Sequence, residues 1–299
     1  MSKVVSLGKI GLDTPLDKIQ LIRLYGAILE SGFDVYFPPE AEEVLQHLSK
    51  YFNIKYHLGI QGIPLLKDKV TISHAKPQCR IGSLTKPLIF PHEMVIKCRA
   101  KWNKERKIHF LFCGLLTEQR KQCLDSWTRE KFGYKNIFLS NQQPLQNLLQ
   151  RFYKQIVDYY NCRHIYQNVG LYVFSSTRGR EFPIKVWDED YYNLLSNSQF
   201  VLCPDGNYTW TYRFFESILC GAIPIVENTC SIYDGFEYFS VKDSLNNLIY
   251  SKEIVEHNFS RARETLTVPH ENLNSYLLEI LRYKQSNKAE VGELEQTVT

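Results

Sequence analysis

Apolar positions in the first fifty residues alternate between short continuous runs and sets with helical spacing. Residues 3–7 and 34–37 are continuous runs, which are typical of buried strands. Between them, residues 14–17 form a helix-start signature, and Gly32 stands where a left-handed residue would end the helix. A second amphipathic helix is expected after residue 39. The order strand, helix, strand, helix predicts a parallel, Rossmann-like sheet.

The same alternation returns in the second half of the chain. Its apolar runs predict strands at residues 107–114, 135–140, 169–176, 198–204 and 222–228. Helices are expected from about Thr117, over 144–160 and over 210–219. Shorter candidate strands lie within residues 53–60 and 86–90. The predicted fold class is therefore α/β, with two Rossmann-like domains whose parallel sheets face a cleft.

A basic polar stretch near residue 100 separates the two patterns, and the change of domain is expected there. The predicted organisation is one domain over 1–100, a second over 101–270, a C-terminal helix over 271–283 and a disordered polar tail over 284–299. A chain of 299 residues with 44% hydrophobic and 23% charged residues is long and apolar enough for two such cores.

Composition also removes several classes of function. A net charge of +4 is too small to indicate nucleic acid as a partner. The chain has no run long enough to span a membrane and no signal-peptide pattern, so we expect a soluble, cytoplasmic protein. The eight cysteines lack metal-ligand spacing and predict reduced thiols, with no metal site. No GxGxxG is present, which disfavours an NAD-dependent dehydrogenase.

The most informative stretch is CPDGNYTWTYRFFESILCGAIPIV, residues 203–226. It predicts a strand end, a polar loop and a helix, and such units bind ligands beyond the carboxyl ends of parallel strands. Arg213 and Glu216 lie three residues apart on this helix. An arginine suits a diphosphate because its planar fork of donors binds oxygens in pairs, and a carboxylate can accept two ribose hydroxyl protons. The alternative is an exposed ion pair of small energetic value.

Residues 196–226 resemble the C-terminal signature of the exostosin-type glycosyltransferases, which supports the ligand-binding interpretation. The matching positions are Ser198, Phe200, Cys203, Pro204, Gly206, Thr211, Arg213, Glu216, Gly221, Ile223, Pro224 and Ile225. Thr211 stands where the family has serine. A fainter match lies in HFLFCGLLTEQR, where Gly114 and Arg120 occupy the family's glycine and arginine, and Thr117 would cap the following helix. Together the matches cover residues 107–240.

The resemblance implies the two-domain GT-B fold, with an acceptor domain followed by a nucleotide-sugar donor domain. It implies an inverting transfer of a sugar from a UDP-sugar to a hydroxyl group of an oligosaccharide or glycan acceptor. Xylose and galactose are the first candidates for that sugar. The expected donor-binding residues are Gly114, Thr117, Arg120, Asp205, Gly206, Asn207, Thr209, Thr211, Arg213 and Glu216. No cofactor is required; a divalent metal is compatible with this chemistry, but no motif indicates one, because the acidic residues 188–190 are explained by a helix start.

The general base is expected in the N-terminal domain, where no motif identifies it. Asp13, in the loop after the first strand, is the first choice, and the pair His92 and Glu93 is the second. Structural roles as a helix cap or as a packed histidine compete with both. Two other functions stay open, which are a GDP-sugar transferase of the fucosyl type and a catalytically silent protein that binds a nucleotide sugar.

Overall fold

The computed structural model describes residues 4–6, 17–52, 55–59, 61, 63–64, 70–73, 75–133, 163–167, 170–176 and 189–282. Asp13, the predicted strand 135–140, the predicted helix 144–160 and the polar tail lie outside these ranges. The chain forms two compact units. One contains the described residues up to Val95 and from Arg263 onward, and the other contains those between Ile96 and Ala262. The two boundaries fall inside helices α3 (His92–Ala100) and α8 (Lys252–Leu266).

The first unit contains a parallel sheet of four strands in the order β3-β2-β1-β4. Its elements are β1 (Val4–Ser6), α1 (Asp17–Leu29), β2 (Asp34–Phe37), η1 (Pro39–Ala41), α2 (Glu42–Phe52), β3 (His57–Leu58) and β4 (Ile63–Pro64). The predicted alternation of strand and helix is thus confirmed. Gly32, however, does not have a positive φ, so the prediction of a left-handed residue was wrong. Its N–H instead donates to Asn274 Oδ1 at 2.9 Å.

A second sheet in this unit has three antiparallel strands, β5 (Val70–Ser73), β6 (Gln78–Ile81) and β7 (Leu84–Lys86). The strand predicted over residues 86–90 was wrong, because β7 ends where that run begins. Pro87 has no N–H to continue the ladder, and the N–H of Phe90 donates to Leu266 O at 2.7 Å. The apolar side chains of this run are still buried, so the sequence pattern reported burial rather than strand.

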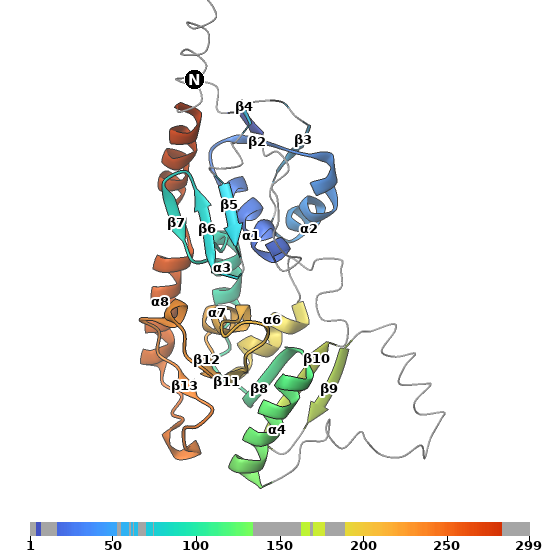
Figure 1. The fold of residues 1–299 in the computed structure, drawn as a ribbon, viewed down its shortest axis with the longest axis vertical. Coiled ribbons are helices and arrows are strands. Elements are labelled where there is room, and N and C mark those ends of the chain that lie inside the picture. Colours follow the sequence, from blue (N-terminus) through green and yellow to red (C-terminus); the bar gives the residue numbers. More distant parts are fainter. Residues whose placement is uncertain are drawn as a thin grey trace, which may run out of the picture. The chain divides into compact units, whose positions relative to one another are not determined.

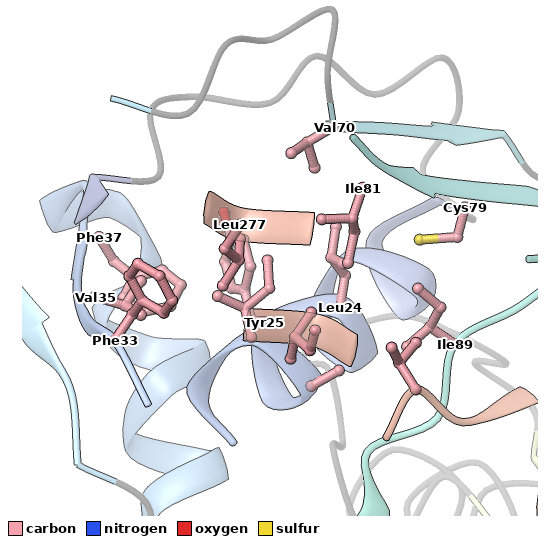
Figure 2. Packing of buried hydrophobic residues seen from close by; sticks show 14 of the residues in the cluster. Leu24, Tyr25, Phe33, Val35, Phe37, Val70, Cys79, Ile81, Ile89 and Leu277 are labelled. Carbon is pink, nitrogen blue, oxygen red and sulfur yellow. The ribbon is translucent and has the colours of Figure 1, made fainter. Parts of the chain in front are cut away.

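The core of the first unit combines both ends of the chain. Tyr25 of α1 packs edge-on against Phe37 of β2, with ring centroids 4.8 Å apart. Helical residues 270–282 contribute Leu273, Leu277, Ile280 and Leu281 to the same buried cluster. Figure 2 shows Leu277 among the side chains of α1, β2 and β6. The last described helix therefore completes the core to which α1 and β2 contribute.

The second unit contains a sheet of six strands in the order β13-β12-β11-β8-β10-β9, in which only β9 is antiparallel to its neighbour. The strands are β8 (Ile108–Leu115), β9 (Arg163–Gln167), β10 (Tyr172–Ser176), β11 (Ser198–Cys203), β12 (Ile223–Val226) and β13 (Phe239–Ser240). This unit also contains helices α4 (Glu118–Phe132), α6 (Glu189–Ser196) and α7 (Tyr212–Leu219) and most of α8 (Figure 1). The short helices η3 (Ser231–Tyr233) and η4 (Leu245–Asn247) lie in it as well.

Four of the predicted strands in this unit, β8, β10, β11 and β12, are confirmed. They are runs of apolar residues because both faces of the sheet are covered. Trp127 of α4 packs on one face against Phe110, with ring centroids 5.1 Å apart. The ring of Phe214 of α7 stacks on the ring of Tyr233 of η3, with centroids 3.8 Å apart. Among the described residues, no helix is both long enough and apolar enough to cross a membrane.

Candidate functional site

The carboxyl ends of β8 and β11 form the topological switch point of the six-stranded sheet. The chain leaves β8 toward β9 and β10 on one side, whereas it leaves β11 toward β12 and β13 on the other. β8 and β11 are neighbours, and the chain segments that follow them run to opposite sides of the sheet. Ligands of open α/β sheets bind at this kind of position. Gly114 lies near the end of β8, and the other predicted donor-binding residues lie after β8 or after β11.

Arg213, in the first turn of α7, reaches from the loop after β11 to the end of β8. Its Nε donates to the carbonyl oxygen of Cys113, and its guanidinium lies 4.4 Å from the ring centroid of Phe112. Gly114 has a φ of 142°, and a Cβ atom at that position would collide with the guanidinium. The glycine therefore makes room for the arginine. Arg213 is 7% exposed, and its buried Nη1 has no hydrogen-bond partner among the described residues.

Arg120, in the first turn of α4, makes the reciprocal connection from the loop after β8. Its Nε donates to Asp205 O at 3.1 Å, and its Nη1 donates to Leu115 O at 3.0 Å. A Cβ atom on Gly206 would collide with this guanidinium. Thr117 is the N-cap of α4, because its hydroxyl accepts from the Arg120 N–H at 3.3 Å. The cap that the sequence predicted is confirmed.

Two arginines thus cross the switch point in opposite directions, Arg213 from α7 and Arg120 from α4. Arg213 donates to a main-chain carbonyl near the end of β8 and lies against Gly114 there, and Arg120 donates to a main-chain carbonyl of the loop after β11 and lies against Gly206. Each is at least nine-tenths buried, so its charge is removed from most of the water that would solvate it. Buried positive charges next to helix N-termini are an arrangement that binds anions in many proteins.

Glu216, one turn after Arg213, is held by tyrosines of α6. Tyr191 Oη donates to Glu216 Oε2 at 2.6 Å, and Tyr192 Oη lies 3.5 Å from Oε1. Glu216 is 8% exposed, and the contacts of Arg213 lead to β8 instead. The alternative of an exposed Arg213–Glu216 ion pair is therefore wrong, because both side chains are buried.

Asp205 opens the loop after β11 and contacts the residues that follow β12. Its N–H donates to Glu227 Oε2 at 3.0 Å, and its Oδ2 accepts from Asn228 Nδ2 at 2.8 Å. Its Oδ1 is buried and has no partner within the described ranges. Burial raises the pKa of the Asp205 carboxyl, and the neighbouring Glu227 carboxylate adds to this effect.

The rest of the loop divides into exposed and buried positions. Asn207 and Thr209 are exposed, whereas Thr211 is buried as the N-cap of α7. The Thr211 hydroxyl accepts from the Phe214 N–H at 3.4 Å, and the backbone N–H of Thr211 donates to Tyr233 Oη at 2.8 Å. Tyr233 also lines a hollow of about 320 Å³ beside β13. That hollow is formed by residues 233–239 and Ile254, and none of the predicted donor-binding residues lines it.

The predicted base candidates belong to the first unit. The N–H groups of His92 and Glu93 donate to the two carboxylate oxygens of Glu30, at 2.8 and 2.9 Å, so Glu30 caps the start of α3. His92 Nε2 lies 3.1 Å from Val268 O. These contacts give the pair a structural role, and its role as base stays a prediction. Asp13 lies outside the described residues.

Sequence reasoning missed several residues around the site. The sequence patterns did not identify Tyr191 and Tyr192, whose hydroxyls contact Glu216. They also did not identify Phe112, against which Arg213 packs, or Glu227 and Asn228, which bind Asp205. The acidic start of α6 at Glu189 and Asp190 is confirmed. Within the described ranges, no group of three or more metal-ligating side chains is present.

Residues 185–246 match the family model of the RXYLT1 C-terminal domain. This segment contains α6, β11, α7 and β12, and therefore Tyr191, Asp205, Arg213 and Glu216. It is a minority of the chain. No curated protein matches the sequence.

The chain is similar to several solved structures at low identity, among them the following three. A sucrose-phosphate synthase from Thermosynechococcus elongatus is 12% identical, with a TM-score of 0.33, over 97% of this chain and 68% of that one. The GtfA/B complex is 10% identical, with a TM-score of 0.32, over 89% and 60%. A glycosyltransferase from Rickettsia africae is 13% identical, with a TM-score of 0.26, over 96% and 70%.

Proposed function

We propose that the protein is a glycosyltransferase whose second unit binds a nucleoside diphosphate sugar at the carboxyl ends of β8 and β11. The observation that carries this proposal is the pair of buried arginines, and above all Arg213 Nη1, which is buried without a hydrogen-bond partner among the described residues. A buried donor without a partner is costly unless a ligand supplies the acceptor. A diphosphate supplies several anionic oxygens, and a guanidinium binds such oxygens in pairs.

The neighbouring carboxylate extends the site toward a nucleoside. Glu216 lies one helical turn from Arg213 and is directed by the Tyr191 hydroxyl. In the proposed complex it accepts hydrogen bonds from the ribose hydroxyls while Arg213 and Arg120 bind the diphosphate. Asp205 Oδ1, also buried without a partner in the described part of the chain, is the group that we assign to a hydroxyl of the donor sugar. The RXYLT1 C-terminal match covers these positions, except Arg120, and supports the assignment.

The proposed reaction is a single displacement with inversion. The acceptor hydroxyl oxygen forms a bond to the anomeric carbon, and the bond from that carbon to the diphosphate oxygen breaks, with its electron pair leaving on the nucleotide. A base removes the hydroxyl proton. Arg213 and Arg120 stabilise the negative charge that develops on the leaving diphosphate. UDP is the first candidate nucleotide, and a glycan the first candidate acceptor, because the exostosin resemblance implies both.

One observation favours a second function. The imidazole of His92, one of the base candidates, lies with its Nε2 3.1 Å from Val268 O, a contact within the first unit that gives this side chain a structural role. A protein that binds a nucleotide sugar without transferring it would need no base. Binding of the donor without turnover across a broad panel of acceptors would support that function over transfer.

Calorimetric titration with UDP, GDP and their common sugar conjugates tests the proposal. We expect one nucleotide to bind, and both Arg213→Ala and Glu216→Ala to weaken it by more than about tenfold, or roughly 1.4 kcal/mol. Arg129→Ala and Glu130→Ala are controls of matched charge on α4, where their side chains are exposed. They should bind as the parent does. Absence of nucleotide binding, or equal binding by all four variants, would contradict the proposal.

A further inference from the structure

The Tyr191 hydroxyl is the shortest contact shown for the Glu216 carboxylate. Tyr191 lies in α6, which precedes β11, and Glu216 lies in α7, which follows it, so the strand brings the two helices into contact. The O–H to Oε2 distance is 2.6 Å, whereas the hydroxyl of the adjacent Tyr192 lies 3.5 Å from Oε1. The two tyrosine rings pack edge-on, with centroids 5.2 Å apart, and this packing restricts both rings.

The direction of this hydrogen bond is fixed. Burial raises the pKa of the Tyr191 hydroxyl well above its ordinary value, and the Glu216 carboxylate raises it further. Tyr191 therefore keeps its proton and donates it, with Glu216 as the acceptor. The positive charge of Arg213 acts in the opposite direction and lowers the pKa of Tyr191, so the hydroxyl that contacts Glu216 is also within electrostatic range of Arg213.

A glutamate side chain has three rotatable bonds, and ordering it when a ligand arrives lowers the affinity. A hydroxyl that holds one carboxylate oxygen before the ligand binds removes part of that cost. The second oxygen then has a defined position relative to Arg213, which lies one turn away on the same helix. The spacing between the diphosphate-binding group and the carboxylate is thereby set by protein contacts alone.

We infer that Tyr191 is a positioning residue, which orients Glu216 toward the ribose of the bound nucleotide and so sets the preference for a ribonucleotide over a 2′-deoxynucleotide. This inference rests on the proposed function, because it assumes that Glu216 contacts the ribose. It makes no demand on the acceptor or on the base, and it concerns only contacts within the second unit.

The test is calorimetric titration with UDP and 2′-deoxy-UDP, and with GDP and 2′-deoxy-GDP, on the full chain. We expect the parent to prefer the ribonucleotide, and Tyr191→Phe to reduce that preference by about fivefold or more while binding of inorganic pyrophosphate is unchanged. Tyr192→Phe, whose hydroxyl is farther from the carboxylate, is the matched control and should change the preference less than about twofold. In a Glu216→Gln background, adding Tyr191→Phe should have no further effect on the preference.

The outcomes separate this inference from the proposed function. If the parent binds a ribonucleotide and Tyr191→Phe keeps its preference, the inference is overturned and the nucleotide site stands. If Tyr191→Phe weakens ribonucleotide, deoxynucleotide and pyrophosphate equally, Tyr191 has only a structural role and the inference is again overturned. If the parent binds neither UDP nor GDP, the proposed function fails and the inference fails with it.

Discussion

Each unit of the molecule holds an ionisable group that its fold has taken largely out of water, and the hydrogen bonds of the two groups differ. In the first unit, the two carboxylate oxygens of Glu30 accept the N–H groups that begin α3, at 2.8 and 2.9 Å. In the second unit, Arg213 donates from Nε to Cys113 O, but its Nη1 is buried without a partner among the described residues.

This difference separates a group whose hydrogen-bonding capacity is used within the fold from one that keeps part of its capacity unused. Glu30 uses both of its oxygens on a neighbouring helix, so its contribution is to the stability of the first unit. Arg213 is oriented by one hydrogen bond and by the Phe112 ring, and it keeps donors that a ligand can use. A buried charge with unused hydrogen-bonding capacity is therefore a better indicator of a site than burial or charge alone.

The largest effect on nucleotide affinity is expected when both Arg120 and Arg213 are replaced. Arg120→Ala combined with Arg213→Ala should lower UDP affinity on the order of 1000-fold, about 4 kcal/mol, because the diphosphate loses two charge-assisted contacts. Titration calorimetry measures the change. Arg129→Ala, which removes an exposed arginine of α4, should leave the affinity as in the parent. If the double variant binds UDP as the parent does, the unused donors of Arg213 do not mark a ligand site, and Arg213 is a structural group like Glu30.

The Glu30 carboxyl should make the first unit sensitive to pH. Burial raises its pKa from 4.5 to about 7, so the folded state favours the protonated form. Its stabilising contribution is complete below pH 4.5 and is lost as the pH rises through about 7. At 1.4 kcal/mol per pH unit, the interval between the two values corresponds to about 3 kcal/mol.

Hydrogen exchange of the α3 amides at pH 5 and at pH 8 measures this loss. Glu30→Gln cannot ionise, and it should make the protection of α3 independent of pH across this interval. The same variant should bind UDP as the parent does. Equal protection of α3 at both pH values in the parent would contradict this prediction, because it would show that ionisation of Glu30 does not destabilise the first unit.

A smaller effect is expected from the glycine that accommodates Arg213. Gly114→Ala should weaken UDP binding about tenfold and lower the free energy of unfolding by about 2 kcal/mol, because the new Cβ displaces the guanidinium and the backbone φ is 142°. Gly133→Ala is the matched control: its φ is 72°, and no atom lies within 4 Å of the added Cβ. It should lose stability but keep the affinity. Equal affinity in both variants would separate Gly114 from the site.

The smallest effect concerns the cap that positions Arg120. Thr117→Ala removes the hydroxyl that accepts the Arg120 N–H, and it should lower the free energy of unfolding by about 1 kcal/mol. Thr117→Ser keeps the acceptor and should restore most of that loss. Denaturant unfolding of the two variants side by side measures the difference, and equal stability would contradict the role of the cap.

Much of the second unit could be predicted from the sequence because its strands are continuous apolar runs. β8, β11 and β12 are buried on both faces, and that burial leaves an unmistakable pattern. β9 and β13 were not predicted, since the former is an antiparallel edge strand and the latter has two residues. α8 was also missed.

The site could be predicted only as a set of residues along two loops. The crossed hydrogen bonds of Arg213 and Arg120 could not be predicted, since their acceptors, Cys113 and Asp205, lie 100 and 85 residues away in the sequence. The sheet order that makes β8 and β11 neighbours decides these contacts, and no local pattern encodes it. For the same reason the contact between Tyr191 and Glu216 could not be predicted. The general base could be assigned only to the N-terminal domain, because no motif identifies it there.

The contribution of helical residues 270–282 to the first core has a consequence for biosynthesis. The ribosome releases α1 and β2 early, but Leu273, Leu277, Ile280 and Leu281, which pack in the same cluster as these elements, emerge only after the whole second unit has been translated. The second unit can therefore fold while the first still lacks its closing helix, and domains generally fold in the order in which they become complete. A nascent chain that stalls before residue 270 would expose an unfinished apolar core, which is a surface that chaperones bind.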